Sequence, residues 1–194
     1  LAYQSVVNLN PERADAWCNL GLTHRYLGNY INAINAYDRA LEVAPDDQTT
    51  LRNKATLLQM LGDTASYART LDRLAALRPG DLAIKAELAQ ALVLEERYAE
   101  AMPLLADLRA KQPEVFEHAY SLGLCFYQLR QYANAVREWE AARQINPDEP
   151  VLLQAMAVAY LRSGDPTAAE RMVAECRSRG IPLDDAFLQE LGVE

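Results

Sequence analysis

Hydrophobic and polar positions follow a helical period along this chain, and the whole pattern then returns at a longer interval. Residues 14–27 and residues 30–43 each place apolar side chains at every third or fourth position, which is one face of an amphipathic helix. Gly28 lies between the two stretches and Pro45 follows the second, and these are residue types that end helices. The pattern therefore predicts two antiparallel helices joined by a short turn.

The same layout recurs every 34 residues. Prolines mark that interval, at Pro11, Pro45, Pro79, Pro113 and Pro147. From this interval we expect four further helix pairs, at 48–61 and 64–77, 82–95 and 98–111, 116–129 and 132–145, and 150–163 and 166–179. A fixed period of this length is typical of stacked helical hairpins that cover one another, rather than of a single globular core.

This layout resembles the tetratricopeptide repeat. The first full block carries the residues that the repeat pattern asks for, namely Trp17, Leu20, Gly21, Gly28, Tyr30, Ala33, Tyr37, Ala40 and Pro45. The block 116–149 matches nearly as well, and the other blocks match less closely. The resemblance implies an all-α fold, a right-handed superhelical solenoid of antiparallel helix pairs.

The period also predicts how the chain is divided. We expect one repeat domain over residues 1–194, with about five repeats between a partial leading repeat and a capping helix. Its parts are the second helix of a truncated repeat at 1–13, repeats at 14–47, 48–81, 82–115, 116–149 and 150–183, and a capping helix at 184–194. A truncated start leaves the apolar side of residues 1–9 uncovered, so we expect a homodimer through that N-terminal face.

Two positions depart from the regular pattern. The turn at Glu96 and Arg97 lacks glycine, so we expect it to be less sharply bent than the others. Pro103 lies inside a predicted helix, where it removes one backbone hydrogen bond and predicts a kink.

The formal net charge is −8, which argues against a nucleic-acid partner, since such proteins usually carry a basic patch. Basic residues do gather in the second repeat, at Arg52, Lys54, Arg69, Arg73 and Arg78. They form either a solvated face, which we favour, or a surface for an acidic ligand.

No stretch is apolar for long enough to predict insertion into a membrane. The three cysteines, Cys18, Cys125 and Cys176, lie in different repeats without metal-ligand spacing, and we expect them to pack between helices. Free thiols favour a reducing compartment, so we expect a cytoplasmic protein, with a periplasmic or envelope-associated location in bacteria as the alternative.

No group of residues predicts catalysis. The two histidines, His24 and His118, lie in separate repeats, and neither a phosphate-binding loop nor a nucleophile elbow is present. We therefore expect neither enzymatic activity nor a cofactor nor a bound metal.

The resemblance implies that the first helix of each pair faces a concave groove in which a peptide lies. The residues expected to bind it are Asn19, Arg25, Arg52, Asn53, Gln59, Gln90, Tyr120, Leu124 and Tyr127. Asn19 and Asn53 occupy the same place in successive repeats, where an amide can pair with an extended peptide backbone, or where Asn is simply common.

Tyr120, Leu124 and Tyr127 form an aromatic stripe that either anchors a partner or packs between repeats. Family members that clamp a terminal carboxylate use Lys, Asn and Arg at set places. Of these only Asn53 is present here, so that function is rejected.

The leading hypothesis is a non-enzymatic scaffold that binds a protein or peptide in its groove. Two alternatives stay open at this point: a substrate-recruiting arm of a larger enzyme such as a glycosyltransferase, and a bacterial assembly or secretion chaperone.

Overall fold

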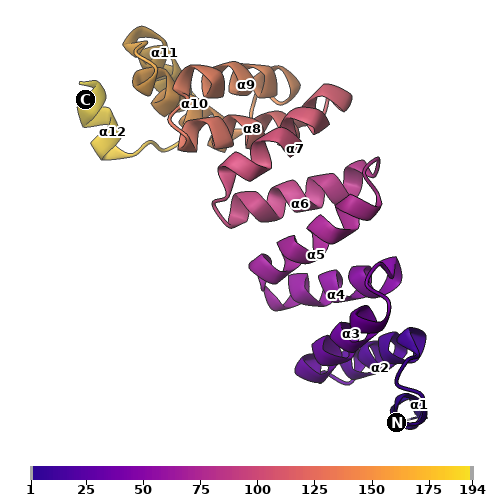
Figure 1. Cartoon of the computed structure of the whole chain (residues 1–194). Helices are drawn as coiled ribbons and strands as arrows, with labels where there is room; N and C mark the ends of the chain where they lie inside the picture. The colour runs from indigo at the N-terminus through magenta and orange to yellow at the C-terminus, as the bar shows by residue number, and fades with distance from the viewer. Residues whose placement is uncertain (1, 193–194) are drawn as a thin grey trace. The chain divides into compact units, whose positions relative to one another are not determined.

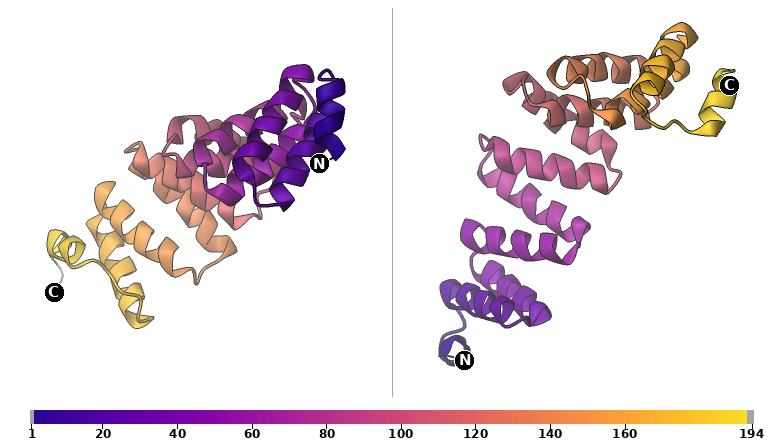
Figure 2. Two further views of the ribbon diagram at one scale, coloured as in Figure 1. Left: turned by 90° about the horizontal axis from the view of Figure 1, so that it is seen from below. Right: turned by 180° about the vertical axis from the view of Figure 1, so that it is seen from behind.

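The structure is a computed structural model that describes residues 2–192. All regular secondary structure in that range is α-helical and no strand occurs there (Figure 1). The prediction of an all-α fold built from successive antiparallel helix pairs is confirmed, and Figure 2 shows the same pairs from two further sides.

The chain forms two compact units, Leu1–Glu95 and Glu96–Glu194, called unit 1 and unit 2 below. Unit 1 contains α1 (Ala2–Leu9), α2 (Ala14–Tyr26), α3 (Tyr30–Val43), α4 (Gln48–Leu61), α5 (Thr64–Leu77) and α6 (Leu82–Leu94). Unit 2 contains α7 (Tyr98–Lys111), α8 (Phe116–Gln128), α9 (Tyr132–Ile145), α10 (Pro150–Arg162), α11 (Pro166–Ser178) and α12 (Asp185–Leu191). The division of the whole chain into one domain with the predicted repeat boundaries stays a prediction.

Helix bounds follow the sequence pattern closely. The helices α3, α5, α7 and α9 begin and end where the sequence predicts. Most first helices end one residue early, because the residue expected to be last becomes the cap, as Leu27 does after α2. Helix α7 runs through Pro103 without interruption.

Each turn inside a helix pair contains one residue in the left-handed region. Gly28, Gly62 and Gly164 take φ values of 74°, 72° and 89°, whereas Glu96 and Arg130 take 57° and 59° at the equivalent positions. The expectation of a less sharply bent turn at Glu96 is therefore wrong. A non-glycine residue adopts this conformation at a cost of about 1 kcal/mol, because Cβ approaches the following carbonyl oxygen.

Two glycines allow aromatic side chains to lie against a first helix. A Cβ atom built on Gly21 would lie 2.6 Å from Cδ1 of Tyr37, and one on Gly123 would lie 2.4 Å from Cδ1 of Trp139. Both aromatic side chains are buried, and the indole Nε1 of Trp139 donates to the carbonyl oxygen of Tyr120 at 3.0 Å.

The remaining repeats fill the same space with different residues. Alanine replaces the glycine and an aliphatic residue replaces the aromatic one, in the pairs Ala55 with Leu71, Ala89 with Leu105, and Ala157 with Val173. All six of these side chains are buried. The glycine is thus used where the opposing side chain is large.

Aspartates start several helices. Asp47, Asp63, Asp81, Asp165 and Asp184 each cap a helix by accepting a hydrogen bond from a backbone N–H of its first turn. Pro166 follows Asp165 at the first helical position, where a missing N–H costs nothing.

Helix α12 packs against the apolar core of unit 2, and its role as the cap of the repeat array stays a prediction. In α12, Phe187 is buried in the cluster that also contains Met156 and Met172, and Arg162 of α10 pairs with Glu190. At the other end of the chain, Val7 of α1 is buried against α2.

Candidate functional site

The first helices of unit 1 line three pockets. The first, of about 400 Å³, lies against α2 and the start of α4. The second, of about 330 Å³, lies between α4 and α6, and the third, of about 270 Å³, lies between the same two helices near their carboxyl ends. The helices α2, α4 and α6 are the successive first helices on which the sequence predicts peptide binding, and the second helix α5 adds Leu74 to the second pocket and Thr64 and Tyr67 to the third.

The two asparagines lie in neighbouring pockets. Asn19 lines the first pocket beside Cys18, and Asn53 lines the second. The amide of Asn53 donates a weak hydrogen bond to Sγ of Cys18 at 3.6 Å. Its carbonyl oxygen, and the whole amide of Asn19, form no side-chain hydrogen bond within residues 2–192, so both can serve a ligand.

A polar network closes one side of the second pocket. Arg52 forms an ion pair with Glu87 at 2.7 Å, and the Tyr67 hydroxyl donates to the same carboxylate at 3.0 Å. Burial raises the pKa of Tyr67 to about 12, and the hydrogen bond to Glu87 acts in the same direction. The phenol stays protonated at neutral pH and fixes the carboxylate that Arg52 contacts.

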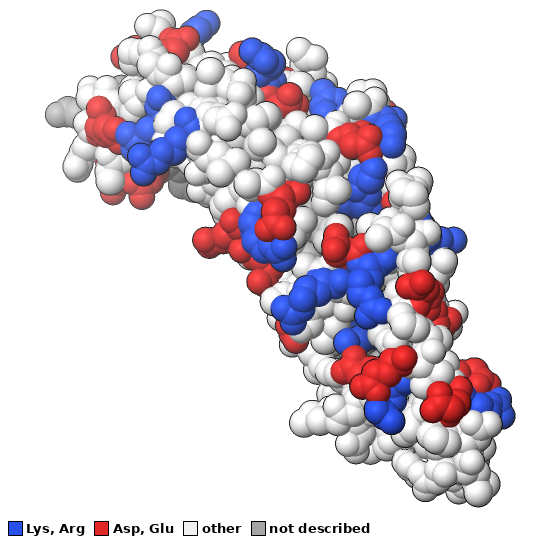
Figure 3. Space-filling view, in the orientation of Figure 1, with Lys and Arg blue, Asp and Glu red and all other residues white. Residues whose placement is uncertain are grey.

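The basic residues of the second repeat have partners of their own. Besides Arg52, Lys54 pairs with Asp38, Arg78 with Asp81 at 3.4 Å, and Arg73 donates to the carbonyl oxygen of Pro45. Figure 3 shows acidic side chains close to basic ones on the side of unit 1 that faces the viewer. This arrangement favours the interpretation as a solvated face over that of a surface for an acidic ligand.

Gln59 and Gln90 meet at the third pocket, together with Tyr67, Glu87 and Leu94. Both glutamine side chains are exposed and form no hydrogen bond within the described residues. The sequence pattern predicts that Gln59 and Gln90 lie on the same face of successive first helices. It does not predict that Tyr67 lies beside them, because Tyr67 belongs to a second helix. Its position next to the turn of the α4–α5 pair was the available signal.

Arg25 lies apart from the pockets. Its guanidinium stacks over the ring of Tyr26 at 5.4 Å, close to the turn between α2 and α3. The structure therefore does not bring Arg25 together with Asn19 and Asn53.

The aromatic stripe of unit 2 packs inside the unit. Tyr120 stacks on Trp139 with ring centroids 6.3 Å apart, and Tyr127 lies 5.7 Å from Trp139 and 5.3 Å from Tyr132. Leu124 packs against the same cluster. These side chains are half-buried, so they support the core of unit 2 whether or not they also contact a partner.

A cysteine thiol is buried in the core of unit 2. Burial raises the pKa of the Cys125 thiol to about 11, so the thiol stays protonated and unreactive. The described residues contain no group of three His, Cys, Asp or Glu side chains placed to hold a metal ion. None of the helices formed by those residues is long and apolar enough to cross a membrane.

A series of antiparallel helix pairs at a constant interval, with polar pockets along its first helices, defines a helical repeat protein. Two family models described as tetratricopeptide repeat match this chain, one over residues 14–47 and the other over residues 86–150. The chain belongs to the tetratricopeptide repeat family.

Curated relatives match it over parts of their length. Superkiller protein 3 of Schizosaccharomyces pombe is 31% identical over 91 residues, which are 47% of this chain and 7% of that protein. The peroxisomal targeting signal receptor of Pichia angusta is 24% identical over 178 residues, 87% of this chain and 31% of the receptor. Protein O-mannosyl-transferase TMTC1 of Homo sapiens is 39% identical over 56 residues, 29% of this chain and 6% of that protein. The chain thus spans less than a third of each of these relatives.

Solved structures share the fold at low sequence identity. MamA from Desulfovibrio magneticus RS-1, solved from residue 41 to its end, superposes with a TM-score of 0.68 at 20% identity, covering 85% of this chain and 93% of the solved chain. YrrB, described as a TPR protein with an unusual peptide-binding site, superposes with a TM-score of 0.67 at 19% identity and 90% coverage of both chains. At these identities the likeness concerns the fold.

Proposed function

We propose that this chain is a non-enzymatic protein-interaction scaffold that binds an extended peptide segment along α2, α4 and α6 of unit 1. The observation that carries this proposal is the row of three pockets along successive first helices, each lined by a side-chain amide with hydrogen-bonding capacity to spare: the whole amide of Asn19 and of Gln90, and the carbonyl oxygen of Asn53. An amide both donates and accepts, so it can pair with the backbone of a peptide of any sequence. Affinity then comes from the amides, and selectivity from the pockets.

Asn19, Asn53 and Gln90 are the residues to which we assign this role. They lie on α2, α4 and α6 respectively, one in each pocket. The Arg52–Glu87–Tyr67 network is assigned a supporting role, because it orders the wall between the second and third pockets. Two relatives support a peptide ligand: YrrB is described as having a peptide-binding site, and the receptor of Pichia angusta is named for the targeting signal it recognises.

The test begins with selection of peptides from a displayed random library on the purified chain. Binding of the enriched peptide is then measured by fluorescence anisotropy for wild type, Asn53→Ala and Gln90→Ala. Each variant removes a hydrogen bond worth about 1 kcal/mol, so we expect a rise in Kd of about fivefold.

Asp72→Ala is the matched control, because Asp72 is an exposed residue of the second helix α5. It should bind the peptide like wild type, and all three variants should keep the helical circular dichroism of wild type. Enrichment of no peptide, or equal binding by wild type and both amide variants, would refute the assignment.

A second candidate function is that of a substrate-recruiting arm in a longer enzyme. The local match to TMTC1, a protein O-mannosyl-transferase, favours it. A full-length reading frame that encodes a transferase domain would support this role, in which the same pockets bind the acceptor protein.

A further inference from the structure

Exposed apolar side chains of unit 1 gather on one edge. Apart from Tyr3 and Leu9 in α1, the exposed large apolar side chains among the described residues of this unit all lie where a first helix ends and a second begins. We call six of them the turn ridge: Tyr26, Leu27, Ile31, Met60, Leu61 and Leu94. Figure 1 shows the α2–α3 turn, the α4–α5 turn and the end of α6 on the same side of the unit.

The fold itself does not require an apolar turn ridge. Positions 26, 60 and 94, spaced by 34 residues, are Tyr, Met and Leu in unit 1. The next two equivalent positions, in unit 2, are Gln128 and Arg162, and both are exposed. Leu129 of unit 2 corresponds to Leu27 and Leu61 and is exposed to 37%, less than either of them. Since polar residues occupy the positions equivalent to Tyr26, Met60 and Leu94 in unit 2, the apolar residues at these places in unit 1 point to a contact outside the chain.

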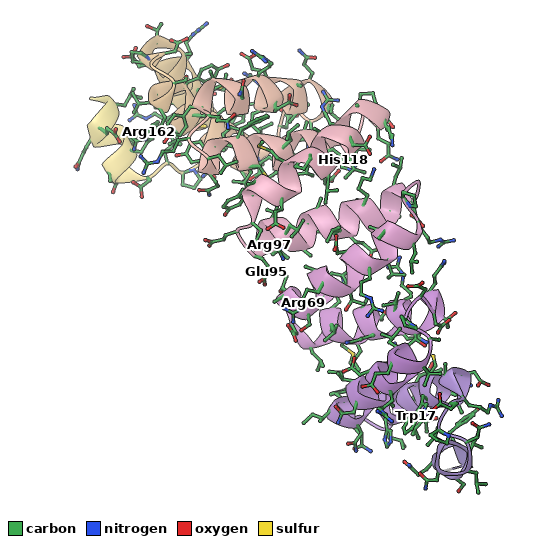
Figure 4. All side chains as sticks on the ribbon, viewed as in Figure 1. Trp17, Arg69, Glu95, Arg97, His118 and Arg162 are labelled. Carbon is green, nitrogen blue, oxygen red and sulfur yellow. The ribbon has the colours of Figure 1, made fainter. Side chains whose placement is uncertain are left out.

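Charge changes sign along the turn ridge. At the first turn, Arg25 has no carboxylate partner within the described residues. The second turn carries one charge of each sign, Asp63 and Arg69. Glu95 and Glu96, the last residue of unit 1 and the first of unit 2, follow α6 directly and form no ion pair among the described residues. The next residue, Arg97, is paired with Glu100, so the turn is left with the two acidic charges. Figure 4 shows Glu95 and Arg69 on this edge.

We propose that unit 1 pairs with a second copy of this chain through the turn ridge, in an antiparallel arrangement with two-fold symmetry. A two-fold axis at Met60 and Leu61 places the basic first turn of one copy against the acidic third turn of the other. The arrangement is self-complementary, as an isologous interface requires. A parallel arrangement would place like charges together at both ends.

The area of the turn ridge suits this partner. Large side chains have roughly 150–250 Å² of surface each. Exposed fractions between 43% and 77% therefore leave roughly 600–900 Å² on the six residues. A stable interface buries about 800 Å² per partner, so the turn ridge is large enough by itself. Tyr, Met and Leu also suit the apolar centre of a homodimer interface.

Sedimentation velocity over a concentration series tests the proposal. We expect wild type to dimerise, and Ile31→Glu combined with Met60→Glu to raise the dimer Kd by at least about tenfold. Both residues are exposed, at 77% and 57%, so the monomer should fold normally. Ala133→Glu combined with Gln128→Glu is the matched control, because these are the equivalent exposed positions in unit 2.

Charge exchange tests the antiparallel direction. Arg25→Glu alone makes both ends of the turn ridge acidic, and Glu95→Arg with Glu96→Arg makes both ends basic, so each should raise the dimer Kd. The three changes together give the two ends of the turn ridge opposite charges again, so the dimer Kd should return to within about threefold of wild type.

A monomer at all concentrations would overturn the proposal and leave the turn ridge to a different protein. Dissociation by Leu9→Glu, with no effect of the Ile31 and Met60 variant, would also overturn it and place the dimer at α1. Leu94 of the turn ridge also lines the third pocket, but the variant that tests the dimer changes neither pocket residue nor peptide-binding amide, because Ile31 and Met60 line none of the three pockets.

Discussion

The close approach of Trp139 to Gly123 predicts a coupled pair of substitutions. A methyl group added by Gly123→Ala would lie 2.4 Å from both Cδ1 and Nε1 of the indole and 3.0 Å from Cε2. Trp139 is 1% exposed and its Nε1 is held by the carbonyl of Tyr120, so the ring has no free space into which to move. Either the ring or helix α8 must shift.

The magnitude follows from two opposing contributions. Overfilling a close-packed core costs about 1–3 kcal/mol. Replacing glycine by alanine inside a helix returns about 1 kcal/mol. We therefore expect Gly123→Ala to lower the free energy of unfolding of unit 2 by up to about 2 kcal/mol.

In the Trp139→Leu background, the effect of Gly123→Ala on the free energy of unfolding should change sign. Alone, Trp139→Leu creates a cavity at a cost of about 3 kcal/mol and removes a hydrogen bond worth about 1 kcal/mol. In that background Gly123→Ala no longer meets the ring and should stabilise unit 2 by about 1 kcal/mol. The double variant has the combination that Ala89 and Leu105 already show in the third repeat.

Urea unfolding followed by far-UV circular dichroism gives the four free energies of the cycle. Trp17, in unit 1, stays as a fluorescent reporter of that unit in every variant. The expected coupling between the two changes equals the cost of overfilling, about 1–3 kcal/mol. Additivity within about 0.5 kcal/mol would refute the steric reasoning. Gly21 and Tyr37 are the equivalent pair in unit 1, and substitutions at these two positions should show the same kind of coupling.

Three further predictions concern stability. Arg130→Gly should raise the free energy of unfolding by about 0.5–1 kcal/mol, because φ is 59° there; a lower midpoint in urea would contradict this. Asp47→Ala should cost about 1 kcal/mol, because the carboxylate accepts from the Thr50 amide at 2.9 Å; Asp47→Asn, which keeps an acceptor, should lose less in the same urea titration. Burial raises the pKa of Tyr37 and of Tyr67 to about 12. The folded state therefore binds these protons more tightly than the unfolded state, so the contribution of the two tyrosines to stability should be constant below about pH 10 and be lost between about pH 10 and 12; an unchanged slope in Tyr67→Phe over that range would contradict the assignment for Tyr67.

Part of the candidate site could be read from position in the repeat. The 34-residue interval brings Asn19 and Asn53 to equivalent places, and the structure has them in neighbouring pockets. The interval alone could not show that Tyr120 and Tyr127 pack against Trp139. A position on a helix face does not reveal how much of a side chain the next helix covers.

The amino-acid sequence by itself determined which segments are helices, where they begin and end, and how they repeat. It does so because those features depend on local signals: apolar spacing within a helix, aspartates and prolines at helix starts, and residues that end a helix. Helix α3 occupies Tyr30–Val43, as the pattern alone predicts.

Only the tertiary structure decided which side chains meet between helices. The contact of Arg52 with Glu87 joins residues 35 positions apart, and that of Tyr67 with Glu87 joins residues 20 apart. It also decided that Glu96 and Arg130 take the conformation of glycine, because the packing of the two helices on either side requires the same turn whatever residue is present. Such contacts depend on the distance and angle between packed helices, which no local signal in the sequence specifies.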